Sequence, residues 1–335
     1  MPDERNFTWQ DGERTIRFGR GTVAQATELL GSGYVLLTTP RARTLAPRVV
    51  DAADETHDVP DGFVDELAGD LVERLGVTDA TLIVALGGGR VIDTAKAVAA
   101  ATGRHAAAIP TTLSSAEMTA VHRRAAGTRQ DVPGVRPRIV INDPDLCASQ
   151  PLQQLAASSA NALAHAVEGP LTTQSSPVPS IAGRDAARLI ADAWMDEEEP
   201  DREALALASL LAGYSIDGNW YGLSHVCSQT LVRVGGAGHG QANAVVLPHT
   251  TAALRRRFPE RLERLDKALG GGDGAAEALA VELARLANAS RIRDLGVPQD
   301  ALDACADAAA GRAELDLTPP RAGRDELRAI YEAAW

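Results

Sequence analysis

The hydrophobic pattern of this chain changes once, near residue 150, and this change limits the folds open to it. Before that point, continuous apolar runs at 34–38, 81–86, 105–109 and 138–141 alternate with segments whose apolar residues recur at helical spacing. Strands that are apolar throughout are buried on both faces, as in a parallel sheet covered by helices. We therefore predict strands in these runs, and helices over 61–75, ending at Gly76, and over 91–101.

Beyond Pro151 the helical period dominates and no convincing strand pattern occurs. The predicted helices cover 152–168, 178–196, 202–217, 241–256, 274–289 and 322–334. The acidic run at 196–199 is expected to be a solvated loop. The chain of 335 residues thus divides into an α/β domain, 1–150, and an all-α domain, 151–335. The cleft between two such domains is the expected site of function.

Composition narrows the classes of function. With 45% hydrophobic and 23% charged residues the chain is globular, and its net charge of −12 disfavours nucleic acid and anionic membranes as partners. No apolar run is long enough to span a bilayer, and the charged start lacks a secretory signal. The three scattered cysteines favour a reducing compartment. We expect a cytoplasmic protein that acts on a small molecule.

A glycine turn is the first candidate for chemistry. Gly87, Gly88 and Gly89 follow the apolar run at 81–86 and open a predicted helix, where free N–H groups and the helix dipole favour a diphosphate. A plain structural turn is the alternative. Asp93 and Lys96 share one face of that helix, either as a solvated ion pair or as part of the same site.

These residues carry a family resemblance. Gly-Gly-Gly-x-x-x-Asp-x-x-Lys, followed by Pro-Thr-Thr and Glu-Met-Thr, resembles the group III (iron-containing) alcohol dehydrogenases, and most closely the maleylacetate reductases. The resemblance covers nearly the whole chain. It implies a dinucleotide-binding α/β domain joined to a helical domain, NADH or NADPH as cofactor, and a homodimer. The cofactor-binding residues that we predict are Thr39, Gly87, Gly88, Gly89, Arg90, Asp93, Lys96, Thr111, Thr112 and Leu146.

Histidines concentrate in the helical half. Asn161, His165 and Glu168 fall on one helix face, and His225 and His239 follow. Taken singly, each histidine could equally be a hydrogen-bonded core residue. By resemblance, Asn161, His165, His225 and His239 occupy the metal-ligand positions of the family, and we expect the three imidazoles to converge. The predicted catalytic residues are His165, His225, His239 and His122.

The chain departs from the family pattern at informative positions. Asn161 stands where iron-type members have aspartate, and an amide is a weaker ligand for Fe²⁺ or Zn²⁺ than a carboxylate. We therefore expect that a divalent metal is not essential. Gln229 replaces a histidine and cannot carry a proton. His122 replaces an aromatic residue, and Arg90 replaces a small one.

The resulting hypothesis is an NAD(P)H-dependent reductase that transfers hydride to an enone or oxo acid. Arg123, Arg124 and Arg233 are candidate contacts for substrate carboxylates. An iron- or zinc-type alcohol or polyol dehydrogenase, or a diverged non-redox member of the fold, is the alternative. Because Arg41 and Arg43 follow Thr39 with no carboxylate to repel a 2′-phosphate, we expect both NADH and NADPH to be used.

Overall fold

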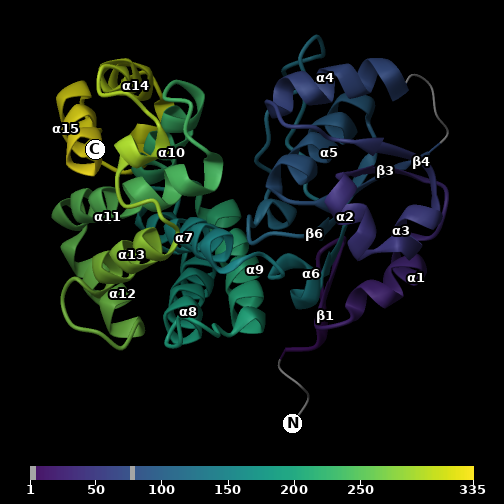
Figure 1. Ribbon diagram of the computed structural model, residues 1–335, viewed down its shortest axis with the longest axis horizontal. Coiled ribbons are helices and arrows are strands. Elements are labelled where there is room, and N and C mark those ends of the chain that lie inside the picture. Colours follow the sequence, from purple (N-terminus) through teal and green to yellow (C-terminus); the bar gives the residue numbers. More distant parts are fainter. Residues whose placement is uncertain (1–4, 76–79) are drawn as a thin grey trace. The chain divides into compact units, whose positions relative to one another are not determined.

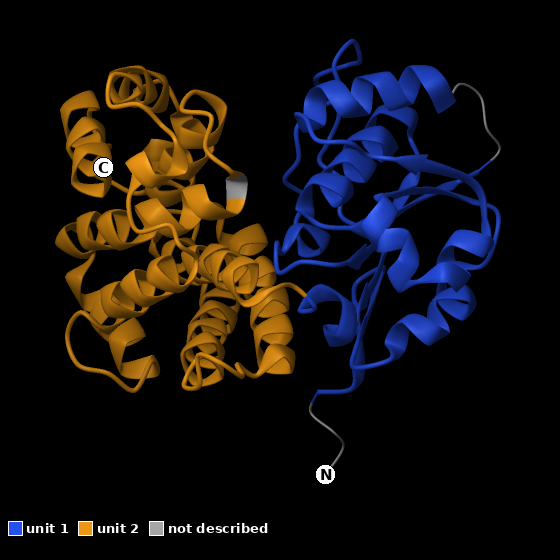
Figure 2. Ribbon diagram, viewed as in Figure 1, with its two compact units in different colours: residues 1–149 blue, residues 150–335 orange. Residues whose placement is uncertain are grey.

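The computed structural model describes residues 5–75 and 80–335, with the side chain of His239 outside that description. The chain forms two compact units, 1–149 and 150–335, coloured blue and orange in Figure 2. The predicted helix end at Gly76 lies outside the described residues. No described helix has the length and apolarity required to cross a membrane.

Unit 1 is built on a seven-stranded sheet in the order β1-β2-β7-β6-β5-β3-β4. β1 pairs with β2 in antiparallel fashion, and every other pair is parallel. The strands are β1 (Phe7–Asp11), β2 (Arg14–Phe18), β3 (Tyr34–Thr38), β4 (Ala53–Asp58), β5 (Leu82–Gly87), β6 (His105–Pro110) and β7 (Ile139–Asn142). The four strands that the sequence predicts are confirmed as β3, β5, β6 and β7.

Three strands escaped prediction because they are not apolar runs. β1 and β2 alternate polar and apolar residues, and β1 lies at one edge of the sheet. β4, at the other edge, has the sequence ADETHD and no buried residue. Charged side chains on an edge strand discourage pairing with another chain, but they also remove the hydrophobic signal.

Helices cover both faces of this sheet (Figure 1). Alternate residues of β3 point to opposite faces, so Val35 and Leu37 pack on one side and Tyr34 and Leu36 on the other. The first face is covered by α4 (Val64–Leu75) and α5 (Gly89–Thr102). The second is covered by α1 (Ala26–Leu30), α2 (Pro40–Leu45), α3 (Pro47–Asp51) and α6 (Pro144–Cys147).

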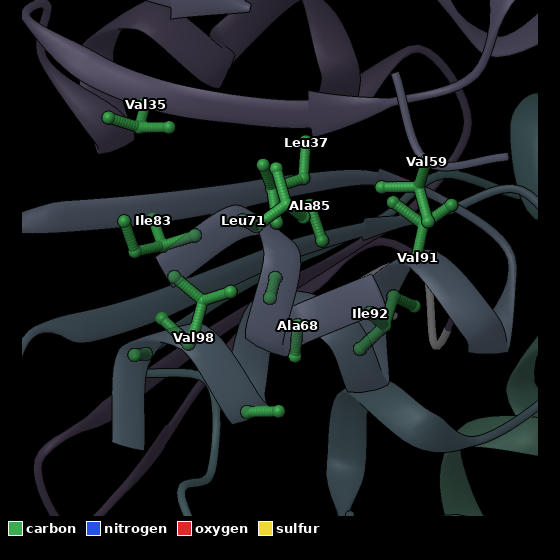
Figure 3. Close-up of a cluster of buried hydrophobic side chains, with 14 of the residues drawn as sticks. Val35, Leu37, Val59, Ala68, Leu71, Ile83, Ala85, Val91, Ile92 and Val98 are labelled. Atoms are coloured by element: carbon green, nitrogen blue, oxygen red, sulfur yellow. The ribbon is translucent and has the colours of Figure 1, made fainter. Parts of the chain in front are cut away.

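The core beneath α4 and α5 is aliphatic (Figure 3). Side chains from β3 and β5 interdigitate with those of the two helices, and each of the labelled residues is nearly or fully buried. The labelled residues are Val35, Leu37, Val59, Ala68, Leu71, Ile83, Ala85, Val91, Ile92 and Val98. This packing fixes the first turn of α5 against the end of β5.

Unit 2 is helical, and its described residues contain no strand. Its helices are α7 (Leu152–Glu168), α8 (Pro177–Ala193), α9 (Arg202–Asn219), α10 (Leu223–Arg233), α11 (His239–Arg257), α12 (Pro259–Ala268), α13 (Ala275–Leu286), α14 (Ala301–Ala310) and α15 (Arg324–Ala334). The six predicted helices correspond to α7, α8, α9, α11, α13 and α15. The shorter α10, α12 and α14 were not predicted.

α7 is the central helix of unit 2 and packs against α8, α9, α11 and α13 (Figure 1). From Leu155 to Glu168 every residue except Ser158 is buried. A helix buried around its circumference is a core helix rather than an amphipathic surface one. The polar side chains that α7 carries in its second half are therefore held inside the protein.

Candidate active site

Unit 1 has a cavity of about 300 Å³ at the carboxyl ends of β3, β5 and β6. From β3 the chain continues to β4 on one side, whereas from β5 it continues to β6 on the other, so the strand order reverses between β3 and β5. Crevices at such reversal points are the usual ligand sites of open parallel sheets. The cavity is lined by Thr39, Arg41, Ala42, Leu45, Gly88, Gly89, Arg90, Val91, Thr111 and Thr112.

The first turn of α5 gives this cavity an affinity for anions. Gly88 is the N-cap and offers no capping side chain, so the N–H groups of the first turn have no intrahelical partner. They add to the positive end of the helix dipole. The cavity therefore suits the diphosphate of a dinucleotide.

The glycines are required by the packing of the protein itself. A Cβ atom at Gly88 would lie 3.0 Å from Cγ2 of Thr112, and one at Gly89 would lie 2.9 Å from Cβ of Ser114. The turn after β5 is thus compressed against the segment after β6. The predicted residues Thr112 and Gly88 meet at this point.

The arginines that line or border the same cavity differ in whether they form ion pairs. Arg43 pairs with Asp58, Nη2 to Oδ1 at 2.9 Å, and Arg90 pairs with Asp61 at 2.7 Å. Arg41 lines the cavity and makes no ion pair with any described residue. Of the two arginines after β3, Arg41 is therefore the one whose charge is available to a ligand.

Lys96 is fully buried and its ammonium group is saturated. Nζ donates to Oδ1 of Asp93 at 2.8 Å, to the carbonyls of Ala116 and Val121 at 2.9 and 2.7 Å, and to Oγ1 of Thr119 at 3.2 Å. Lys96 thereby ties α5 to the loop over 116–121. Its role in the structure is to position that loop and Asp93.

Glu117 lies in the same loop and is also buried. Its Oε1 accepts a hydrogen bond from Nδ2 of Asn142 at 3.3 Å, and Asn142 Oδ1 accepts from Sγ of Cys147 at 3.1 Å. Burial raises the pKa of Glu117 to about 7, against the opposing charges of Lys96 and Arg14. The loop therefore contains a carboxyl group that titrates near neutrality.

Leu146 and His122, both predicted as site residues, are engaged by contacts within the fold of unit 1. Leu146 is buried on α6 in the apolar core behind the sheet. His122 has both ring nitrogens within hydrogen-bonding distance of backbone groups: Nδ1 lies 2.7 Å from the carbonyl of Arg123, and Nε2 accepts from the N–H of Val135 at 3.1 Å. Burial lowers the pKa of His122 to about 4, so it is neutral near pH 7. Neither nitrogen is open to a substrate, which makes His122 a brace for its loop.

In unit 2 the structure brings together two predicted histidines. His165 of α7 and His225 of α10 stack with ring centroids 4.8 Å apart and planes 17° apart. Asn161, one turn before His165, is buried, and its Oδ1 accepts from Nδ2 of Asn243 at 2.9 Å. His239 begins α11, and its side chain lies outside the described residues.

Glu168 orients His225. Its carboxylate is fully buried and accepts from the N–H groups of Ser224 at 2.5 Å and His225 at 3.2 Å, in the first turn of α10. Oε2 also lies 2.7 Å from Nδ1 of His225. Because an ionised carboxylate can only accept hydrogen bonds, Nδ1 of His225 carries the ring proton and Nε2 is left with its lone pair. Nε2 is buried and hydrogen-bonds to no described residue, which leaves it for a ligand.

A polar cluster that sequence reasoning missed adjoins His225. The Tyr221 ring lies 5.5 Å from the His225 ring, and its hydroxyl donates to Oε1 of Glu314 at 3.2 Å. Arg312 pairs with Glu314 through Nε at 3.0 Å and Nη2 at 2.7 Å, and Nη2 also donates to Oε1 of Gln229 at 3.1 Å. Gln229 thus binds an arginine. Nothing local in the sequence signals this cluster.

The predicted arginine contacts are placed differently. Arg124 donates from Nε to the carbonyl of Val132 at 2.9 Å and from Nη1 to that of His122 at 3.3 Å, so it braces its own loop. Arg123 is exposed, and Arg233 is exposed at the last residue of α10. Arg312 is therefore the arginine that the structure joins to the surroundings of His225.

The described side chains do not by themselves form a site for a divalent metal. They offer two imidazoles and the Asn161 amide oxygen, which is already engaged by Asn243. Among the residues whose side chains are described, no three His, Cys, Asp or Glu side chains are grouped to hold a metal ion. Glu168, a buried carboxylate beside the two described histidines, already accepts from three N–H donors.

Comparison with known proteins covers both units. Residues 43–151 match the family "Iron-containing alcohol dehydrogenase", and residues 155–335 match "Fe-containing alcohol dehydrogenase family, C-terminal". A maleylacetate reductase from Sphingobium indicum is 30% identical over 86% of each chain. One from Pseudomonas aeruginosa is 30% identical over 98% of each chain. The solved structure of a candidate alcohol dehydrogenase from Ralstonia eutropha JMP134 superposes with a TM-score of 0.85, at 29% identity over 98% of each chain.

Proposed function

This chain belongs to the iron-containing alcohol dehydrogenase family and is an NAD(P)-dependent oxidoreductase, and we propose that it reduces an enone acid of the maleylacetate type. The observation that carries the proposal is the buried pair of Glu168 and His225, whose Nε2 is left for a ligand. Such a pair can protonate or stabilise an oxygen on which negative charge develops.

In this proposal the cavity of unit 1 binds the nicotinamide cofactor. The N–H groups at Gly89 and Arg90 meet the diphosphate, and Thr111 and Thr112 line the adenine side. When bound, the cofactor supplies a hydride. Arg41 lines the cavity with its charge uncompensated by any described residue, so a 2′-phosphate is tolerated or favoured. We therefore propose that NADH and NADPH are both used.

His225 handles the oxygen of the substrate. As hydride adds to one carbon of the C=C–C=O unit, the π electrons move to the carbonyl oxygen, and protonated His225 donates from Nε2 to that oxygen. The enol then returns to the ketone: the second carbon takes a proton from solvent, and the proton on oxygen returns to Nε2 of His225. Glu168 compensates the positive charge of His225 while the ring carries both protons. His165 stacks on this ring and holds its plane. The location of the reaction between the two domains stays a prediction.

Arg312 is the proposed contact for a substrate carboxylate. Nε and Nη2 are used by Glu314 and Gln229, and Nη1 has no hydrogen bond to a described residue. The guanidinium is only partly exposed and is fixed by these partners, so it is pre-organised for a second carboxylate. Tyr221 connects it to the His225 ring.

A resident metal is not essential in this proposal. Three imidazoles and an amide oxygen, in place of a set that includes a carboxylate, bind a divalent ion weakly, and the oxygen of Asn161 already accepts a hydrogen bond from Asn243. The charge that a metal would neutralise is met instead by the protonated His225.

The direct test is oxidation of NADH and NADPH by the purified protein with maleylacetate, with and without a chelator. Substrate-dependent loss of reduced cofactor that persists in chelator is expected. A chain that oxidises simple alcohols or diols only when Fe²⁺ or Zn²⁺ is supplied would instead be a metal-dependent alcohol dehydrogenase. No turnover with any enone or 3-oxo acid, despite measurable cofactor binding, would contradict the proposal.

We further propose that the enzyme is a cytoplasmic homodimer. All three cysteines, Cys147, Cys227 and Cys305, are buried free thiols, which fits a reducing compartment. Light scattering of the eluted protein measures the assembly directly. A monomer at working concentration would contradict the dimer.

A further inference from the structure

Besides the cavity of unit 1, the structure has a cavity of about 310 Å³ in unit 2. The pair His165 and His225 does not line it. It lies among α7, the short turn Gly169–Leu171, α8 and α12. The lining residues are Ala166, Val167, Pro170, Leu171, Ser175, Ser176, Pro177, Ser180, Arg184, Arg261, Leu262, Arg264 and Leu265. Asn161, His165, Tyr221 and His225 are not among them. The cavity is therefore separate from the site proposed for reduction.

Its wall combines apolar and cationic parts. Aliphatic side chains from α7 and α12, such as Val167 and Leu265, supply an apolar surface. Arg184 of α8 and Arg261 and Arg264 of α12 supply three positive charges, and no acidic residue lines the cavity. In a chain whose net charge is −12, such a concentration of positive charge attracts anions.

Two of these arginines form no ion pair with a described residue. Arg184 is half-buried, and neither it nor Arg264 has a hydrogen bond or ion pair with a described residue. Arg188, one turn further along α8, is by contrast paired with Asp185 and Asp192. Arg184 therefore lines the cavity without a carboxylate partner among the described residues.

The guanidinium of Arg261 is positioned by contacts with uncharged groups. Its Nη1 donates to the carbonyl of Pro170 at 3.0 Å and to Oγ of Ser175 at 3.3 Å. Its guanidinium carbon lies 5.8 Å from the centre of the Phe258 ring. These contacts fix the side chain but leave its charge uncompensated, and Arg264 follows three residues later on the same face of α12.

We propose that this cavity binds a small organic dianion, a dicarboxylate or a phosphate monoester with a short apolar body. Guanidinium groups recognise both kinds of anion through paired hydrogen bonds. The aliphatic wall takes the carbon skeleton, and the serine hydroxyls complete the polar contacts. The volume is that of a small-metabolite site.

The test is calorimetric titration of the full-length protein at low salt with phthalate, phenyl phosphate and the neutral phthalamide. One dianion or both bind with one-to-one stoichiometry, and phthalamide does not. Arg184→Gln and Arg264→Gln each weaken binding about tenfold or more, the loss of a charge-assisted contact. Arg188→Gln, whose charge is paired on the surface of α8, binds as the parent does.

A second titration separates this site from the histidine site. His225→Ala retains dianion binding if the cavity is the site, because His225 does not line it. Loss of binding in His225→Ala with retention in Arg184→Gln overturns the proposal, as does the failure of both dianions to bind the parent. Unchanged circular dichroism and thermal midpoints establish that the arginine variants fold.

Discussion

Nδ1 of His225 lies 2.7 Å from Oε2 of Glu168, and that carboxylate also accepts from the N–H groups of Ser224 and His225 in the first turn of α10. One buried charge therefore performs two tasks: it caps a helix and selects the tautomer of the histidine on that helix. This relationship makes Glu168 a positioning residue for the proposed reaction.

Replacing Glu168 by Gln is expected to lower kcat with maleylacetate by roughly 10²- to 10⁴-fold. The amide group brings N–H donors toward donors of α10, so the orientation of His225 is lost together with the compensating charge. NADPH affinity, measured by fluorescence titration, is expected to stay unchanged because the cofactor cavity lies in unit 1. Glu168→Asp, which keeps the charge, should lose less. Full activity in Glu168→Gln would contradict the proposed role.

Asn161→Asp is expected to raise the affinity for Zn²⁺ or Fe²⁺ by at least about tenfold. The new carboxylate adds an anionic oxygen beside His165, and Asn243 can still donate to it. Calorimetry with Zn²⁺ measures the change, and Asn6→Asp, on an exposed position, controls for added charge alone. Equal Zn²⁺ affinity in Asn161→Asp and the parent would show that position 161 does not face a metal.

Arg41→Ala is expected to weaken NADPH binding by about tenfold or more, the loss of one charge-assisted pair with the 2′-phosphate, and to change NADH binding little. The difference should shrink as salt is added. Arg43→Ala is the matched control, because Arg43 is already paired with Asp58. If Arg41→Ala changes the dissociation constants for NADPH and NADH equally, the Arg41 side chain does not contact the 2′-phosphate.

Lys96→Met is expected to destabilise the protein by about 3–5 kcal/mol, because it removes a fully buried ammonium group and leaves half-buried Asp93 and two loop carbonyls without their donor. The chain has one other lysine, Lys267, which is exposed and paired with Glu263 within one helix. Lys267→Met should therefore have little effect on chemical denaturation. A stable Lys96→Met that merely binds NADPH poorly would point to a direct cofactor contact instead.

Stability is expected to depend on Glu117 in a defined pH window. Burial raises its pKa from 4.5 to about 7, so between these values the unfolded chain loses the proton and the folded chain keeps it. Folding is thus favoured by the neutral carboxyl below pH 4.5, and up to about 3 kcal/mol of that advantage is lost as the pH rises to 7. Urea denaturation of Glu117→Gln should show a gain over the parent that grows through this window. Glu66→Gln, on the exposed face of α4, gives the baseline.

Local patterns in the sequence were sufficient for much of the fold. β3, β5, β6 and β7 are continuous apolar runs, and a strand buried on both faces needs no long-range information to be recognised. Helical spacing likewise places Asn161, His165 and Glu168 on one face of α7. The glycine turn was found because a strand precedes it and a helix follows.

Only the tertiary structure decided which polar side chains far apart in the sequence come into contact. Glu168 and His225 are separated by 57 positions, and Gln229 and Arg312 by 83, so no periodicity links them. Whether Arg41 or Arg43 keeps its charge free depends on Asp58 at the carboxyl end of β4, a neighbouring strand. Residue type and spacing determine which face of an element is buried, since burial is set locally by hydrophobicity. Partner choice among polar groups depends on how the elements pack, and only the folded chain fixes that.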